Sequence, residues 1–281
     1  MIDEFEEHRG LLLGVAYRLL GSMWDAEDVV QEAFLRWSGA DRSGVRSVRA
    51  FLITVVTRLA LDQLGSARSR RETYPGPWLP EPVAGDQVGP LDTVELRESL
   101  SYATLHLLER LTPPERAVVV LREAFQLPYE DIAEAVGVSA ASCRQLFRRG
   151  KARLGEDDRR MVAGEGEHRR LLERFMAAAA GGDLAELTSV LAEDVVAYND
   201  GGGKVRAALR PVVGRDRVIA FVAGLVRRFG LDSHSWIDVN GGVGLRIGMS
   251  GSQQVLAVDV RDGRISSLYA ILNPSKLSRV G

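Results

Sequence analysis

The chain has 281 residues, of which 46% are hydrophobic and 26% charged, and its formal net charge is −2. This length predicts two or three compact units, and no apolar run reaches the roughly 18 residues that a membrane-spanning helix needs. The single cysteine, Cys143, rules out a disulfide within these residues and favours a cytoplasmic location, and the acidic N-terminus lacks the basic-then-apolar order of a signal peptide.

The first helical stretch extends from Phe5 to about Arg71, with apolar residues at helical spacing. Within it, Asp25 is the predicted N-cap of an acidic helix, with Asp28 as the capping-box acid. A further helix is expected over residues 48–67, and arginines at positions 68, 70 and 71 close the stretch. A single basic run is usually a solvated face, but a second basic run, over residues 144–153, closes the next helical stretch. Together they favour a nucleic-acid partner despite the net negative charge.

Residues 74–90 break the helical pattern with five prolines among glycines. Proline lacks a backbone donor and disfavours helix in the preceding residue, so an extended linker between domains is expected. Helices resume near residue 91 and continue to about residue 154. Thr112-Pro113-Pro114-Glu115 predicts a helix start, because it combines a capping threonine, a proline at the first helical position and a box-closing glutamate.

Residues 127–154 have the spacing of a helix-turn-helix. Gly137 supplies a turn residue that tolerates positive φ, Ser139 caps the second helix, and Cys143 and Phe147 are expected to pack it onto the first. The unused face of the second helix suits a major groove, where arginine pairs with guanine and glutamine with adenine. It carries Ser142, Arg144, Gln145, Arg148 and Arg149, and Lys151 and Arg153 add attraction to phosphate. The alternative is an ordinary helical hairpin with a basic solvent face.

The last part of the chain mixes helix and strand patterns. One helix carries Leu171, Leu172, Phe175, Met176 and Ala179 and ends at Gly181-Gly182, and another follows over residues 184–191. Strands are expected over residues 205–213, 235–239, 243–249, 255–260 and 265–271, with a helix over 216–229. Asn240-Gly241 and Asp262-Gly263 are dipeptides that two-residue hairpin turns favour. These patterns predict an α+β domain with helices packed on a curved antiparallel sheet.

Residues 25–35 (DAEDVVQEAFL) resemble the polymerase-binding helix of extracytoplasmic-function sigma factors, the group IV members of the sigma-70 family. Residues 52–71 resemble the helix that follows it, and residues 111–154 resemble the second domain of these proteins. The resemblance covers most of the first 155 residues in the right order. It implies two all-α domains, sigma domain 2 over residues 1–72 and sigma domain 4 over residues 93–156, with a linker over 73–92.

The resemblance further implies core RNA polymerase and promoter DNA as partners. Core polymerase would bind an acidic and apolar helix face: Asp25, Asp28, Gln31, Glu32, Phe34 and Trp37. The −10 element would meet the loop over residues 39–48 and a basic set on the next helix: Arg49, Arg58, Gln63, Arg68, Arg70 and Arg71. The −35 element would meet Ser139, Ser142, Arg144, Gln145, Arg148 and Arg149 of the helix-turn-helix.

Residues 167–281 resemble a SnoaL-like cone domain, and three short stretches resemble a subgroup in which this extension is a built-in regulator. The first is in the linker: Trp78, Leu79, Pro80, Glu81 and Pro82. The second is in the extension: Asp200, Gly201, Gly202, Gly203 and Lys204. The third is near the end: Asn273, Pro274, Lys276 and Leu277, around Ser275. The resemblance implies an intramolecular contact between the C-terminal domain and the sigma domains that controls activity in cis.

Two alternatives stay open. Some SnoaL-like cones bind small molecules or are enzymes, so Tyr198, Asp200, His234, Trp236 and Asp259 are candidates for ligand contact or acid–base chemistry. No convergent pair supports catalysis, so a non-enzymatic domain, with a small-molecule ligand as one possibility, is preferred. The other alternative is a helix-turn-helix regulator that works without polymerase. No Cys/His cluster has metal-ligand spacing and no glycine loop suits a phosphate, so no metal or cofactor is expected.

Overall fold

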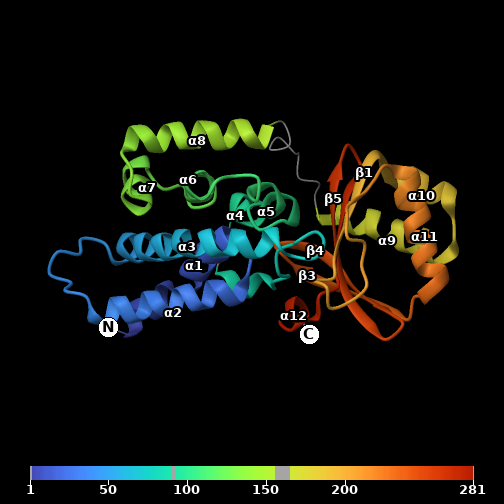
Figure 1. Ribbon diagram of the computed structural model, residues 1–281, viewed down its shortest axis with the longest axis horizontal. Helices are drawn as coiled ribbons and strands as arrows, with labels where there is room; N and C mark the ends of the chain where they lie inside the picture. The colour runs from blue at the N-terminus through green and yellow to red at the C-terminus, as the bar shows by residue number, and fades with distance from the viewer. Residues whose placement is uncertain (1, 90–92, 156–164, 281) are drawn as a thin grey trace. The chain divides into compact units, whose positions relative to one another are not determined.

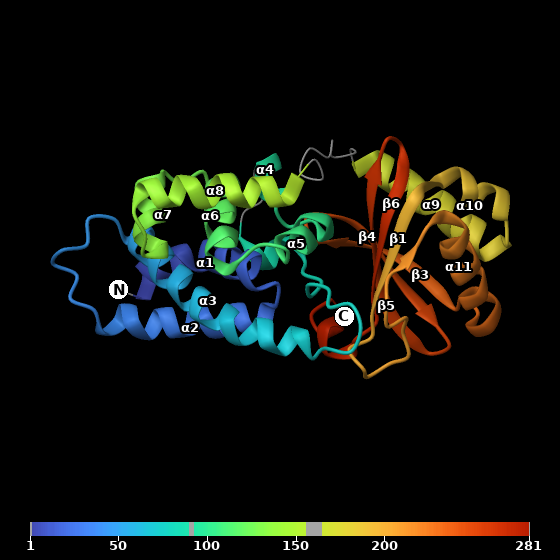
Figure 2. The ribbon, with the colours of Figure 1, turned by 45° about the horizontal axis from the view of Figure 1, so that its top comes forward.

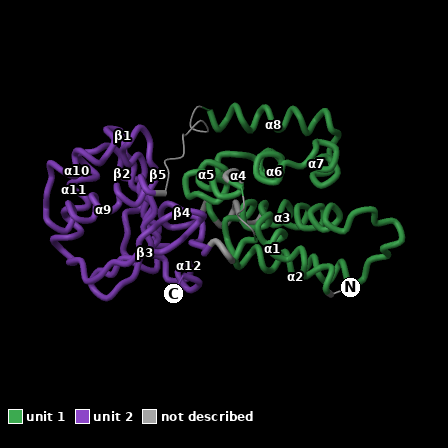
Figure 3. Tube along the Cα trace, turned by 180° about the vertical axis from the view of Figure 1, so that it is seen from behind, with its two compact units in different colours: residues 1–73, 85–158 green, residues 74–84, 159–281 purple. Residues whose placement is uncertain are grey.

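The computed structural model describes residues 2–89, 93–155 and 165–280. The chain forms two compact units, Met1–Thr73 with Gly85–Asp158, and Tyr74–Ala84 with Arg159–Gly281 (Figure 3). The expected linker is therefore divided, because its first part belongs to the second unit. Among the helices of the described ranges, none is both long and apolar enough to cross a lipid bilayer.

The first unit begins with three long helices that pack on one another: α1 (Ile2–Leu20), α2 (Met23–Gly39) and α3 (Val48–Glu72) (Figure 1). Apolar faces hold them together, and Leu12 and Leu19 of α1 are fully buried. The predicted N-cap of α2 is wrong, because Ser22 caps the helix and its hydroxyl accepts a hydrogen bond from the Asp25 backbone N–H at 3.3 Å. Asp25 lies instead in the first turn, where a negative charge also stabilises the helix.

The rest of the first unit, within the described residues, consists of η1 (Gly85–Val88), α4 (Val94–Glu98), α5 (Tyr102–Leu108), α6 (Pro113–Glu123), α7 (Tyr129–Val136) and α8 (Ala140–Leu154). The predicted start of α6 is confirmed, since Glu115 accepts a hydrogen bond from the Thr112 backbone N–H at 3.1 Å. The predicted turn is confirmed too, because Gly137 has a φ of 77°. Helices α7 and α8 therefore form the expected helix-turn-helix.

The second unit is a six-stranded sheet with helices on one face (Figures 1 and 2). Its elements are α9 (Glu165–Gly181), α10 (Leu184–Val190), β1 (Leu191–Asp200), β2 (Val212–Val213), α11 (Arg215–Phe229), β3 (Ser233–Val239), β4 (Gly242–Met249), β5 (Ser252–Arg261), β6 (Arg264–Ile271) and α12 (Pro274–Leu277). The strand order is β2-β1-β6-β5-β4-β3, and β1 and β6 are the parallel pair in an otherwise antiparallel sheet. The predicted fold class is confirmed.

Two strand boundaries differ from the sequence pattern. The strand expected over residues 205–213 is wrong for most of its length, because only Val212–Val213 pair with a neighbour. The pattern also fails to predict β1, whose alternation is interrupted by a register shift between Leu191 and Val196. Proline at position 211 and the charged residues of this region leave the backbone outside the sheet ladder.

The hairpin turns follow the local sequence. Asn240-Gly241 and Asp262-Gly263 have φ values of 54° and 70°, and of 52° and 70°, as two-residue turns of the predicted type require. A third turn at Ser250-Gly251, with φ values of 48° and 75° typical of the same class, joins β4 to β5. The sequence pattern does not predict it, since serine is a less usual first turn residue than asparagine or aspartate.

Strand pairing divides the sheet residues between two faces. The face covered by α9, α10 and α11 carries Val195, Leu245, Leu256 and Leu268, which form one core with apolar residues of those helices. The opposite face carries Tyr198 stacked on Tyr269, with ring centroids 5.5 Å apart. The ends of β1 and β6 lie next to each other because the two strands are parallel, and Asp200 pairs with Ile271 there.

Candidate nucleic-acid interface and linker-binding site

A small apolar core holds the two helices of the helix-turn-helix together. Ile132 and Cys143 are fully buried, and Ala133 and Leu146 are nearly so. Burial raises the pKa of the Cys143 thiol, so this side chain stays protonated and packs as a small apolar group. The expected structural role of Cys143 is therefore confirmed.

The predicted −35 contacts all lie on the exposed face of the second helix and its cap: Ser139, Ser142, Arg144, Gln145, Arg148 and Arg149. Ser139 caps the helix, and its hydroxyl accepts a hydrogen bond from the Ser142 backbone N–H at 3.1 Å. Arg144 pairs with Glu130 at 2.9 Å, but both side chains are about half exposed, at 49% and 66%. Water weakens such a pair, so the guanidinium is able to exchange Glu130 for a base edge.

The other end of α8 is attached to α6 through a buried carboxylate. Glu115 is 1% exposed and accepts a hydrogen bond from Arg153 at 2.6 Å, while Arg149 lies 3.5 Å from its second oxygen. Lys151 pairs with Glu123 at 3.2 Å. These pairs fix the direction in which the basic side chains leave the helix, and the Arg149 side chain is still 58% exposed.

The outer face of α2 combines acidic and apolar side chains. Of the predicted polymerase contacts, Asp28, Gln31 and Glu32 are exposed, and Asp25 and Phe34 are partly exposed. Trp37 does not lie on this face. It is 1% exposed, its ring packs against Phe51, and the guanidinium of Arg42 lies 4.5 Å from its centroid. Its expected surface role is therefore corrected to a core role.

Sequence reasoning misses two exposed apolar residues on the same helix. Trp24 is 54% exposed and Leu35 is 60% exposed. With Asp28 and Gln31 they follow the spacing of four, three and four residues that places side chains in one stripe along a helix. The signal that the sequence offers is a large apolar residue at helical spacing from acids.

Three of the four predicted −10 residues of α3 whose side chains the structure describes have partners within the first unit. Arg58 donates a hydrogen bond to the Glu134 carbonyl of α7 at 2.8 Å, and Gln63 donates to the Asp25 carboxylate at 2.9 Å. Arg49, near the start of the helix, is exposed. The side chains of Arg68 and Arg70 lie outside the described residues. Contacts of α3 with α6 and α7 thus hold the predicted −10 helix against the second sigma domain.

A buried ionic cluster, formed by Arg71, Glu109 and Arg116, strengthens that contact. Arg71 pairs with one oxygen of Glu109 and donates to the Leu20 carbonyl, and Arg116 pairs with the other oxygen. Burial alone would raise the pKa of Glu109, but the two guanidiniums outweigh this effect and hold the pKa below its usual range. The cluster joins α3 to α6 through the C-cap residue of α5, and we call it the Glu109 cluster.

In the second unit, the three stretches singled out in the sequence meet around Asp200. This carboxylate is fully buried and accepts hydrogen bonds from the Tyr74 hydroxyl at 2.6 Å and from the Leu79 backbone N–H at 2.9 Å. The Tyr74 hydroxyl in turn accepts from the Asn273 amide at 2.8 Å. Burial, followed by the bond to Asp200, raises the pKa of Tyr74 above its usual range, so the phenol remains a proton donor.

Lys276 completes this arrangement, which we call the Asp200 clamp (Tyr74, Leu79, Asp200, Asn273 and Lys276). Its ammonium donates to the Asp200 carboxylate at 2.7 Å and to the Leu79 carbonyl. It also lies 4.2 Å from the Trp78 ring centroid and 5.0 Å from that of Tyr74. Both charged side chains are almost completely buried, so each depends on the other for solvation.

Two further contacts fix the linker on the same domain. Val83 and Asn240 exchange hydrogen bonds, from the Asn240 N–H to the Val83 carbonyl at 2.8 Å and from the Val83 N–H to the Asn240 side-chain oxygen at 3.1 Å. Gly202 has a φ of 58°, and a Cβ there would lie 2.2 Å from the Asn273 amide nitrogen. Glycine is therefore required where this loop meets the end of the chain.

The rest of the predicted regulatory set lies beside the clamp. Pro80, Glu81, Pro82 and Gly201 are buried, Leu277 is partly buried, and Gly203, Lys204 and Pro274 are exposed. Lys204 donates a hydrogen bond to the Ser275 hydroxyl. All three stretches thus contribute to one linker-binding site.

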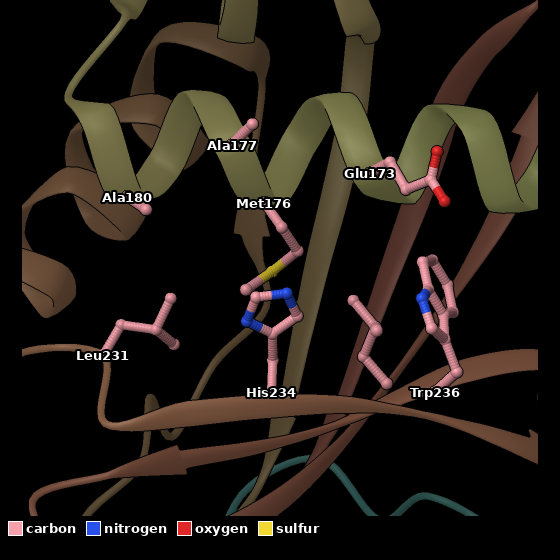
Figure 4. Close-up of a pocket in the computed structure, with 8 residues that line it drawn as sticks. Glu173, Met176, Ala177, Ala180, Leu231, His234 and Trp236 are labelled. Carbon is pink, nitrogen blue, oxygen red and sulfur yellow. The ribbon is translucent and has the colours of Figure 1, made fainter.

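The candidates for acid–base chemistry are not brought together. Tyr198, Asp200 and Asp259 belong to the sheet face opposite the helices, while His234 and Trp236 belong to the face toward α9 (Figure 4). Every oxygen of Asp200 is already used by the clamp. Among the described residues, no group of three or more His, Cys, Asp or Glu side chains is placed to hold a metal ion.

A helix-turn-helix with an exposed basic helix, carried by an all-α unit and followed by an α+β domain that holds its linker, defines a multidomain transcription factor. Comparison with protein families agrees. The models for Sigma-70 region 2 and Sigma-70 region 4 match residues 5–70 and 102–154, and the SnoaL-like domain model matches residues 172–268.

Comparison with curated proteins and solved structures is more specific. The chain is 40% identical over 292 aligned positions to the ECF RNA polymerase sigma factor SigJ of Mycobacterium tuberculosis, covering 99% of this chain and 93% of that protein. It is 38% identical to the probable ECF sigma factor SigI of the same species, over 75% of this chain and 72% of SigI. The crystal structure of SigJ matches with a TM-score of 0.79 and 37% identity, covering 99% of both chains.

The chain therefore belongs to the extracytoplasmic-function RNA polymerase sigma factors. It directs RNA polymerase to promoters and carries a SnoaL-like C-terminal domain. The predicted family and the predicted promoter-directing function are confirmed.

Proposed function

We propose that the C-terminal domain controls this sigma factor in cis by holding the linker between its two sigma domains. The Asp200 clamp carries the proposal, because it joins the linker to the end of β1 and to the segment after β6 through a buried ion pair and four further hydrogen bonds. A buried charge pair of this kind is costly to break from one side, so the linker is held in one conformation.

Linker length supports a restraint on the separation of the sigma domains. The −10 and −35 elements lie about 25 base pairs apart, or roughly 85 Å of duplex at 3.4 Å per pair. A free linker of residues 74–92 extends to about 65 Å at most, at roughly 3.4 Å per residue. With residues 74–84 held, the part of this linker outside the C-terminal domain is eight residues long and spans at most about 27 Å. Release of the clamp therefore allows a separation that the held linker opposes.

The DNA and polymerase contacts are proposed residue by residue. Exposed Arg144 and Gln145 of α8 would read bases of the −35 element, and Arg148 and Arg149 would contact phosphates. Arg49 and Arg58 of α3 would meet the −10 element once Arg58 leaves the Glu134 carbonyl. Core polymerase would bind the stripe of Trp24, Asp28, Gln31 and Leu35 with the neighbouring Asp25, Glu32 and Phe34.

The C-terminal domain is proposed to be a regulatory module without catalytic activity, acting with the polymerase in the cytoplasm. The separation of the acid–base candidates on two faces of the sheet supports this, since catalysis needs converging groups. Covalent attachment keeps the domain at high effective concentration near the sigma domains, so modest contacts suffice for control.

The test is promoter-dependent transcription in vitro with purified core polymerase. The full chain is compared with Lys276→Met and with truncations before Glu167 and just after Asn273. Arg227→Met, which changes an exposed cationic side chain of α11 outside the linker-binding site, is the matched control. Altered initiation at one defined start site by Lys276→Met and both truncations, with the control unchanged, supports cis control. Equal initiation by the full chain and all its variants would refute it.

A further inference from the structure

The side chain of Tyr129, the first residue of α7, lies beside α8, the helix that carries most of the proposed −35 contacts. Its ring meets the ring of Phe147 on α8 edge to face, with the centroids 6.0 Å apart. The guanidinium carbon of Arg122 on α6 lies 4.9 Å from the Tyr129 centroid, and Arg122 is itself fixed by a hydrogen bond of 2.8 Å to the Leu127 carbonyl. Contacts from two helices thus hold the tyrosine ring in one orientation.

The ring of Tyr129 also supports Arg144, a proposed −35 residue. The guanidinium carbon of Arg144 lies over the ring, 5.3 Å from its centroid, within the roughly 6 Å at which a cation and an aromatic face attract each other. Glu130 accepts a hydrogen bond from the same guanidinium at 2.9 Å. Arg144 is therefore held by an aromatic ring and by a carboxylate, and both belong to the first turn of α7.

These two contacts use different parts of the guanidinium. The group is planar, its N–H bonds lie in the plane, and its faces stack on aromatic rings. Guanine accepts from the N–H edge through O6 and N7, as the two oxygens of a carboxylate do. Glu130 therefore occupies the edge that a base needs, whereas Tyr129 leaves that edge free. Replacement of Glu130 by a base is compatible with unbroken stacking on Tyr129.

We propose that Tyr129 is a positioning residue for −35 recognition, which holds Arg144 in the orientation that a base edge needs. This inference rests on the proposed base contact of Arg144. The Arg144 side chain is 49% exposed, so without the ring it would sample many rotamers and lose more conformational entropy when it binds DNA. Tyr129 acts through its aromatic face, so its hydroxyl group is dispensable for this role.

Selection of duplexes with a randomised −35 region by the holoenzyme, followed by sequencing of the bound fraction, tests this role. We expect Arg144→Ala to lose the preference at one base pair. Tyr129→Leu and Tyr129→Met should reduce the preference at that same base pair about two- to fivefold, the range that an exposed cation–π contact gives. Two variants remove the ring, so the test does not depend on the folding of either one. Tyr129→Phe keeps the ring and, as the matched control, should keep the full preference.

The same geometry predicts an effect of opposite sign for Glu130→Gln. Glutamine removes the charge that competes with a base for the N–H edge of Arg144, so the preference at the Arg144 base pair should rise by up to about fivefold. A fall in this preference would mean that the carboxylate orients Arg144 instead of the ring, which overturns the proposal.

Three further outcomes decide the role of Tyr129. A preference that both ring-removing variants leave unchanged, or reduce equally at every position, overturns it, because a merely structural effect is not confined to one base pair. An equal loss in Tyr129→Phe also overturns it, since the hydroxyl group would then make the contact. If Arg144→Ala itself leaves every preference unchanged, the proposed base contact fails and the positioning role with it. The first two failures leave that base contact standing, so they are distinguishable from the third.

Discussion

Replacing Lys276 by methionine is the sharpest perturbation of the Asp200 clamp. Methionine keeps an unbranched apolar stem of similar length but removes the ammonium from between the Asp200 carboxylate and the rings of Trp78 and Tyr74. Asp200 is fully buried, so it is left as a charge without its cation.

The burial of the Lys276–Asp200 ion pair sets the free-energy cost that we expect for Lys276→Met. Removing one partner of a buried ion pair costs about 3–5 kcal/mol. Because Asp200 keeps the Tyr74 hydroxyl and the Leu79 N–H as donors, we expect the lower end, about 3 kcal/mol. At about 1.4 kcal/mol per factor of ten, the held linker then loses roughly 150-fold in its equilibrium over the released linker.

Amide hydrogen exchange measures this equilibrium at the Leu79 N–H, which donates to Asp200 only when the linker is held. Protection at Leu79 should fall by the same factor, roughly 150-fold, in Lys276→Met, while protection in the helix-turn-helix stays unchanged. Arg227→Met, at an exposed position of α11, is the control and should behave as the parent chain. Equal protection at Leu79 in both variants would show that the ion pair does not hold the linker and would refute the reasoning.

Three further changes test the other surfaces. Arg144→Ala should weaken −35 binding by about 1–3 kcal/mol and relax base preference, measured by duplex titration of the holoenzyme, whereas Lys151→Ala should weaken all sequences alike. Trp24→Ala, which removes a half-exposed ring, should weaken core polymerase binding by at least about 2 kcal/mol in a competition assay and leave the melting temperature unchanged. Glu109→Gln should destabilise the first unit by about 3 kcal/mol, because Arg71 and Arg116 lose their shared carboxylate.

Each of these three predictions has an outcome that would contradict it. Unchanged promoter preference in Arg144→Ala would exclude a base contact, and normal polymerase binding by Trp24→Ala would exclude the proposed stripe. The depressed pKa of Glu109 means that its stabilisation is present above the unfolded pKa of about 4.5 and is lost as pH falls through the folded value. The stability deficit of Glu109→Gln should therefore shrink in acid, and a constant deficit would argue against the ionic mechanism.

The features that the sequence alone predicts correctly are those set by residues next to one another in the chain. The capped start of α6, the turn at Gly137 and the hairpins at Asn240-Gly241 and Asp262-Gly263 depend on adjacent residues, so their patterns are readable without a structure. Strand β1 is harder, because its register shift breaks the alternation that marks a strand.

The two tryptophans of α2 show where pattern reasoning fails. Trp24 and Trp37 are thirteen residues apart, which places them roughly 220° around a helix of about 100° per residue. Only one of the two tryptophans can lie on a given face of α2, and the sequence does not show which face the neighbouring helices cover. Packing against Phe51 buries Trp37 and leaves Trp24 exposed.

Long-range contacts set the same limit on the candidate sites. Three stretches can be singled out from the sequence, but Tyr74 and Asp200 are 126 residues apart and Lys276 lies another 76 residues away. Nothing local predicts that they share one carboxylate. In the same way, the sequence does not distinguish the arginines near the end of α3, yet Arg71 forms an ion pair with Glu109.

Two buried ionic sites lie on either side of Thr73 in the sequence. Arg71 belongs to the Glu109 cluster of the first unit, and Tyr74 belongs to the Asp200 clamp of the second. The chain can extend from residue 71 onward only when the contacts of both the Glu109 cluster and the Asp200 clamp break. If they open as one step, Glu109→Gln and Lys276→Met together should release the linker less than the sum of the single effects, by at least about 0.5 kcal/mol in a double-mutant cycle read at Leu79. Additive effects would mean that the sigma domains separate independently of the linker, and control would then act through the clamp alone.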